Sequence, residues 1–89
     1  MALQWTKTAL RCVDEIAGFI AKDNPPRATG VVLELKEALT KMQVHPGMGR
    51  AGRVPGTREL VLHNTYIAIY RVRGDGVEIL RLHHVARNL

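Results

Sequence analysis

The first half of the chain carries apolar residues at helical spacing. From residue 7 to about residue 22 they recur every three or four positions, as at Val13, Ile16 and Ile20, and this spacing predicts an amphipathic helix. The same spacing returns from Pro25 to about Gln43 and predicts a second helix. Because only a short break separates the two segments, we expect an antiparallel helical hairpin.

Residues suited to helix starts precede both predicted helices. Thr6 or Thr8 can cap the first helix, because a hydroxyl oxygen accepts a hydrogen bond from an unpaired amide of the first turn. Asn24 can cap the second helix in the same way. Pro25 suits the first turn of that helix, where no amide hydrogen is needed.

The second half of the chain changes to patterns that are typical of β-strands. We expect strands at Arg58–His63, Tyr66–Arg73 and Val77–Val85, separated by short connections, one of which is Gly74-Asp75-Gly76. Residues 3–5 predict a short extended segment that joins the same sheet. The sequence therefore predicts an α+β fold of one domain, residues 1–89, in which an N-terminal antiparallel helical hairpin packs on a mainly antiparallel sheet of three to four strands.

Strict alternation predicts which side chains of the last strand share a face. It groups Arg81 and His83 with Val77 and Ile79, and it places His84 on the opposite face. The last two strands begin apolar on both sides and gain charge toward their ends. We therefore expect a sheet that is largely covered on both faces and has a cationic rim.

The positive charge lies mostly in the C-terminal half, where arginine alone supplies it. Residues 1–45 hold six Lys/Arg and five Asp/Glu, whereas residues 46–89 hold seven Arg, no Lys and three Asp/Glu. Three acidic groups cannot neutralise seven arginines. Since the guanidinium group suits bidentate contact with carboxylate or phosphate, we expect an anionic partner, either a nucleic acid or an acidic protein segment.

Three of these arginines, Arg50, Arg53 and Arg58, lie in the glycine- and proline-containing stretch between the second helix and the sheet. Glycine permits backbone turns that other residues resist, and proline fixes φ. The stretch therefore predicts a shaped, cationic connection that serves as a binding surface.

The residue inventory excludes several kinds of chemistry. There is no serine, hence no serine nucleophile, and the single cysteine, Cys12, excludes an internal disulfide and fits a small core residue. No histidines have the helical spacing of metal ligands, and His83 and His84 should point apart on a strand, so we expect neither a metal nor a cofactor. The absence of a signal-peptide pattern and of a long apolar run predicts a cytoplasmic protein with no membrane partner.

Several motifs follow one another in a definite order. Trp5 and Ala9 precede the predicted hairpin with its Asn24-Pro25 break, and the residues from His45 lead to Gly-Thr-Arg-Glu-Leu at 56–60. Tyr-x-x-x-Tyr-Arg-Val at 66–72 and the run 77–87 come next. In these motifs nearly the whole chain resembles the RelE/ParE superfamily of toxins from bacterial type II toxin–antitoxin modules. The resemblance implies a compact α/β toxin that an antitoxin wraps and neutralises.

The superfamily that this chain resembles contains two activities on one fold. ParE-like members poison DNA gyrase, whereas RelE-like members cut mRNA in the ribosomal A site without a metal. The ribonucleases commonly carry Tyr-Arg-x-x-Tyr, and here Ile67 replaces that arginine. They also tend to supply lysines or a glutamate near the central loop, whereas residues 44–57 contain neither Lys nor an acid, and no tyrosine follows Tyr70. The resemblance is therefore closer to the ParE-like branch and implies a gyrase inhibitor rather than an enzyme.

The resemblance and the charge pattern together nominate site residues. Contacts with the target or the antitoxin are expected from Arg50, Arg53, Arg58, His83, His84 and Arg87. If the protein is instead a ribonuclease that acts on mRNA at the ribosome, then Arg58, Tyr70, His83 and His84 should lie nearest the chemistry.

A third alternative is an inactive relative that only binds its antitoxin, because Asn88-Leu89 stands where ParE-like chains commonly have Trp-Pro. All three alternatives share one expected partner. It is a cognate antitoxin with an acidic, amphipathic segment that folds on this chain and forms a hetero-oligomer with it.

Overall fold

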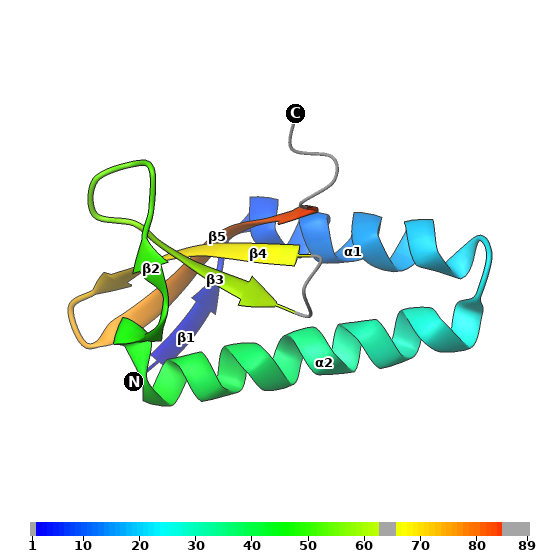
Figure 1. Cartoon of the computed structure of the whole chain (residues 1–89), viewed down its shortest axis with the longest axis horizontal. Helices are drawn as coiled ribbons and strands as arrows, with labels where there is room; N and C mark the ends of the chain where they lie inside the picture. The colour runs from blue at the N-terminus through cyan, green and yellow to red at the C-terminus, as the bar shows by residue number, and fades with distance from the viewer. Residues whose placement is uncertain (1, 63–65, 85–89) are drawn as a thin grey trace.

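The computed structural model describes residues 2–62 and 66–84, and this part of the chain confirms the predicted α+β fold (Figure 1). Its elements in chain order are β1 Ala2–Trp5, α1 Lys7–Ala21, α2 Pro25–Val44, the short 3-10 helix η1 Pro46–Met48, β2 Arg50–Ala51, β3 Arg58–Leu62, β4 Tyr66–Arg73 and β5 Gly76–His84. Neither described α-helix is long and apolar enough to cross a membrane.

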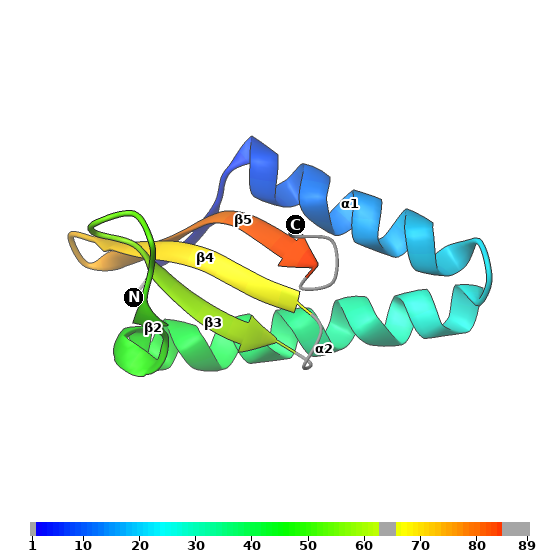
Figure 2. The same cartoon turned by 45° about the horizontal axis from the view of Figure 1, so that its top comes forward.

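The strands form one sheet in the order β1-β5-β4-β3-β2, in which β1 runs parallel to β5 and the other neighbours are antiparallel (Figure 2). The sheet thus has one strand more than the three to four that the sequence predicts. The additional strand is β2, in which Arg50 and Ala51 pair with Glu59 and Arg58. Two residues are too few to leave an alternating pattern, so β2 exists only because β3 offers it an edge.

Both helices pack against the same face of the sheet, where the core lies. The buried cluster combines Ala9 of α1 and four residues of α2 with residues of β3, β4 and β5, among them Leu62, Ala68 and Ile79. No described helix lies on the opposite face, where Val61 is 51% exposed. For the described part of the chain, the expectation of cover on both faces is therefore wrong, because both apolar helix stripes meet one sheet face.

The predicted helix starts are confirmed. Thr6 caps α1, where its hydroxyl accepts a hydrogen bond from the Ala9 amide at 3.0 Å. Asn24 caps α2, where its side-chain oxygen accepts from the Arg27 amide at 3.1 Å, with Pro25 in the first turn.

A β-bulge in the pairing of β4 with β5 changes the predicted side-chain faces. Ile69 lies opposite Arg81, whereas the next residue, Tyr70, lies opposite Ile79, so β5 contains one unpaired residue, Leu80. Val77 and Ile79 therefore face the core, and Arg81 and His83 do not share their face. The predicted grouping of these four residues is wrong, because strict alternation cannot include an inserted residue.

Candidate functional site

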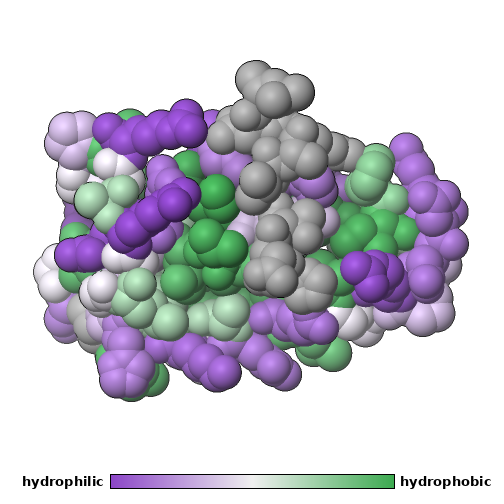
Figure 3. Space-filling model, in the orientation of Figure 1, coloured by the Kyte–Doolittle hydropathy of each residue, from purple (hydrophilic) through white to green (hydrophobic). Residues whose placement is uncertain are grey.

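A shallow groove of about 290 Å³ lies on the face of the sheet that the helices leave open; we call it the open-face groove. Ile67 and Ile69 of β4 supply its apolar floor. The other lining residues are Arg50, Ala51, Arg53, Glu59 and His83. Figure 3 shows apolar surface over the sheet on this side of the molecule, bordered by hydrophilic side chains.

Two of the residues that line the groove, Arg50 and Glu59, form an ion pair. Arg50 donates to the Glu59 carboxylate at 3.3 Å, and the Glu59 side chain is only 12% exposed whereas that of Arg50 is 65% exposed. Glu59 is not among the site residues expected from the sequence, since its position beside Arg50 depends on the unpredicted pairing of β2 with β3. Glu59 offsets one positive charge and leaves the groove cationic.

A closed loop carries Arg53 to the groove. The Gly52 amide donates to the Thr57 carbonyl at 2.8 Å, and the Thr57 hydroxyl donates to the Val54 carbonyl at 2.6 Å. Gly56 has a φ of +85°, a conformation that glycine adopts without strain. Arg53 forms no ion pair with the described residues, so its guanidinium is available to a partner.

His83 lies half-buried in the groove. Burial lowers the pKa of His83 below its ordinary value of 6.5, and the positive charge of Arg81 lowers it further, followed by that of Arg53, while Glu59 opposes them. The imidazole is therefore neutral near pH 7. A bound carboxylate or phosphate would act in the same direction as Glu59 and raise this pKa.

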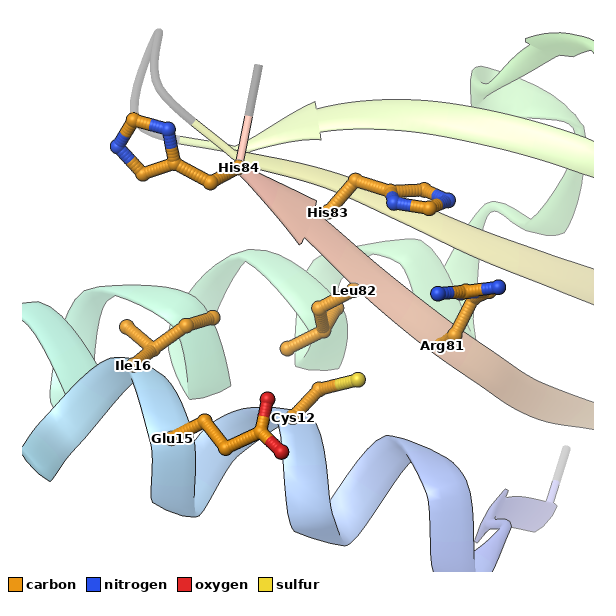
Figure 4. A pocket seen from close by; sticks show the side chains of 7 residues that line it. All are labelled: Cys12, Glu15, Ile16, Arg81, Leu82, His83 and His84. Carbon is orange, nitrogen blue, oxygen red and sulfur yellow. The ribbon is translucent and has the colours of Figure 1, made fainter. Parts of the chain in front are cut away.

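His84 points away from the groove. Figure 4 shows the His83 and His84 rings turned in opposite directions from β5, as strand alternation predicts. The His84 ring packs edge-on against Tyr66, with centroids 5.1 Å apart and planes at 83°. Both histidines border a second hollow of about 290 Å³, where β5 lies beside Cys12, Glu15 and Ile16 of α1. No group of three His, Cys, Asp or Glu within residues 2–62 and 66–84 could hold a metal ion.

Arg58 and Tyr70 form hydrogen bonds with backbone carbonyls outside the groove. The Arg58 guanidinium donates to the Gly49 carbonyl at 2.9 Å. Tyr70 is fully buried, and its hydroxyl donates to the Pro46 carbonyl at 2.7 Å. Neither side chain lines the open-face groove.

The structure therefore divides the nominated residues into groups. Arg50, Arg53 and His83 meet at the open-face groove. Arg58 and Tyr70 support the backbone behind it, and His84 faces the other side of β5. Arg87 lies outside the described residues.

Comparison with known proteins gives the family. A family model described as the ParE toxin of a type II toxin–antitoxin system, parDE, matches residues 3–89. The Y4kP protein of Sinorhizobium fredii is 45% identical over 83 residues, which cover 92% of this chain and 85% of that protein. Toxin RelE2 of Caulobacter vibrioides is 34% identical over 83 residues, which cover 93% of each chain.

Solved structures share the fold. A chain from the chromosomal ParDE system of P. aeruginosa matches with a TM-score of 0.87 and 31% identity over 96% of each chain. The HP0894 protein of Helicobacter pylori matches with a TM-score of 0.62 and 19% identity over 97% of this chain and 96% of that one, which shows the fold alone. With its full-length match to the family model and its close relatives, this chain belongs to the ParE toxin family of type II toxin–antitoxin systems.

Proposed function

We propose that this ParE-family toxin acts by binding, and that its target is DNA gyrase. The observation that carries the proposal is the use of Arg58 and Tyr70, whose polar groups hydrogen-bond to the backbone at Gly49 and Pro46 and do not line the open-face groove. Cleavage of RNA needs a proton acceptor and a proton donor beside the reacting oxygens. Neither Arg58 nor Tyr70 lines the groove, so neither supplies such a group there. The open-face groove offers cationic walls and an apolar floor, which suit the binding of an anionic, partly apolar surface.

We further propose that a cognate antitoxin neutralises the toxin by covering this groove with an acidic, amphipathic segment. The carboxylates of such a segment would meet Arg50 and Arg53, and its apolar side chains would meet Ile69. The similar chain from P. aeruginosa comes from a ParDE system, which supports the existence of such a partner.

Supercoiling of relaxed DNA by purified gyrase tests the proposal. The wild-type chain should inhibit supercoiling, and Arg53→Ala should weaken the inhibition by about tenfold, because it removes a charge-assisted contact. The control is Arg27→Ala, which removes the same charge from an exposed position at the start of α2. Undiminished supercoiling at a high concentration of the wild-type chain would refute the assignment of gyrase.

A second candidate function, cleavage of mRNA on the ribosome, is favoured by two observations. The neutral imidazole of His83 lies in the groove with Glu59 and two arginines, and one relative carries the name Toxin RelE2. Incubation with translating ribosomes separates the two candidates. A message cut by the wild-type chain, left intact by His83→Ala and still cut by His84→Ala would establish the ribonuclease. If expression of the chain alone causes no growth defect, the inactive antitoxin-binding relative is the remaining alternative.

A further inference from the structure

We infer that Tyr70 is the positioning residue of the cationic loop, residues 50–58. Its buried hydroxyl fixes the start of β2 and thereby sets the positions of Arg50 and Arg53. The functional consequence of this inference rests on the proposed binding role of the open-face groove. Its structural part stands on hydrogen bonds and sterics alone.

The Tyr70 hydroxyl joins both ends of the 3-10 turn η1. It donates to the Pro46 carbonyl at 2.7 Å and accepts from the Gly49 amide at 3.0 Å. The ring is fully buried in the core, so the hydroxyl is held by packing as well as by its two partners. A single side-chain atom therefore clamps the backbone immediately before β2.

Gly49 fits this position because it lacks a side chain. A Cβ added there would lie 2.5 Å from the Tyr70 hydroxyl oxygen and 2.9 Å from the Glu59 carbonyl oxygen, closer than real Cβ contacts come. The backbone at Gly49 is extended, with φ −78° and ψ 155°, which any residue adopts. The need for glycine is therefore steric and arises from the approach of Tyr70.

Arg58 completes the clamp from the other side. Its guanidinium donates to the Gly49 carbonyl at 2.9 Å, so both polar backbone groups of Gly49 are bound to side chains of the sheet. We call the three residues Tyr70, Gly49 and Arg58 the Tyr70 latch.

The latch is needed because β2, with two residues, is too short to be stable by its own strand pairing. Two paired residues give little stability to a strand, yet β2 places Arg50 against Glu59 and is followed by the closed loop that carries Arg53. If the latch opens, both guanidinium groups lose their fixed positions at the groove. Preorganised charge binds more tightly than mobile charge, since less conformational freedom is lost on binding.

Limited proteolysis with trypsin measures the latch without any target. Trypsin cuts after arginine, and the bond after Arg50 lies inside β2, so it is cut only when β2 leaves the sheet. Tyr70→Phe removes only the hydroxyl and should raise the rate of this cut by roughly tenfold to a hundredfold, as expected when buried polar groups lose their partner. Gly49→Ala should raise the same rate while the tyrosine stays intact.

The matched control is Tyr66→Phe, which makes the same change on the same strand. Tyr66 is also buried, and it has no hydrogen bond to η1 or β2. Its variant should be cut after Arg50 at the wild-type rate. Thermal unfolding of each variant shows whether the whole molecule or only β2 has opened.

Inhibition of supercoiling provides the second measurement. Tyr70→Phe and Gly49→Ala should inhibit gyrase about tenfold less well than the wild-type chain and the Tyr66→Phe control. If trypsin cuts after Arg50 equally fast in the wild type and both latch variants, the latch is refuted. If the cut accelerates but the wild-type chain leaves gyrase untouched, the latch stands and the proposed target is wrong.

Discussion

At the scale of single residues, the electrostatic environment of His83 is the most informative feature. Burial disfavours its imidazolium, and so do Arg81 and Arg53, while Glu59 favours it. All these charged groups face the open side of the sheet or its edge. The pKa of His83 should therefore rise when an anion binds in the groove, because a nearby negative charge favours the imidazolium.

The lowered pKa of His83 predicts a pH dependence of stability. In the unfolded chain the ring takes up a proton near pH 6.5, whereas the folded protein resists this uptake to lower pH. The stabilisation is therefore present above pH 6.5 and is lost as the pH falls through the folded pKa. Chemical unfolding at pH 7.5 and pH 5.5 should show a larger loss of unfolding free energy in the wild type than in His83→Gln, and equal losses would contradict the assignment.

At the scale of elements, Thr6 couples the start of α1 to the bulge in β5. Its hydroxyl accepts from the Ala9 amide and donates to the Leu80 carbonyl at 2.8 Å. The Thr6 amide donates to the Ile79 carbonyl at 3.1 Å. Leu80 is the residue without a pairing partner on β4, so Thr6 satisfies a carbonyl that the bulge releases.

Thr6→Ala should lower the free energy of unfolding by about 1–2 kcal/mol, because it removes a helix cap and leaves the Leu80 carbonyl without this donor. In a domain of this size, each kcal/mol corresponds to roughly 4–8 °C in Tm. Thermal unfolding followed by circular dichroism measures the shift. Thr8→Ala is the control, since Thr8 is exposed within the first turn, and its Tm should change much less.

At the scale of the whole molecule, the two faces of the sheet serve different purposes. One face packs against both helices and forms the core with them. The other face carries apolar side chains beside arginines. Ion pairs neutralise two of these arginines, Arg50 with Glu59 and Arg71 with Glu78. Arg53 and Arg81 form no ion pair with the described residues. Within the described part of the chain, Arg53 and Arg81 therefore leave unpaired positive charge on the side without helices, where the proposed acidic partner would be attracted.

Association with the cognate antitoxin should weaken as salt rises, because the guanidinium groups and the carboxylates are screened. Arg53→Gln with Arg81→Gln should make the dissociation constant less sensitive to salt between low and physiological ionic strength. Lys22→Gln with Arg27→Gln removes the same charge near the α1–α2 turn and should keep the wild-type salt dependence. Calorimetry or surface plasmon resonance measures the difference, and identical salt dependence of the two double variants would refute the electrostatic account.

The sequence predicted the helices and their caps because these depend on local interactions. Thr6 and Asn24 bind amides three residues away, so their roles can be predicted from a short window. The main strands were predictable for the same reason, since alternation and turn residues are local. The cationic loop was visible as a cluster of arginines between glycines. Its partners were not visible, because Glu59 and Tyr70 reach it only across strand pairs and a 3-10 turn.

By itself the sequence determined the two helices, the three long strands, the uneven charge and the likeness to a toxin family, all of which are carried by residues near one another along the chain. Only the tertiary structure decided which arginines remain available, because Arg58 bonds to Gly49 and Arg50 to Glu59 through contacts nine residues apart. It also decided which side chains of β5 point toward the core, since one unpaired residue moves every later side chain to the opposite face of the sheet. Hydrogen bonding and close packing between distant segments set these features, and no local pattern encodes them.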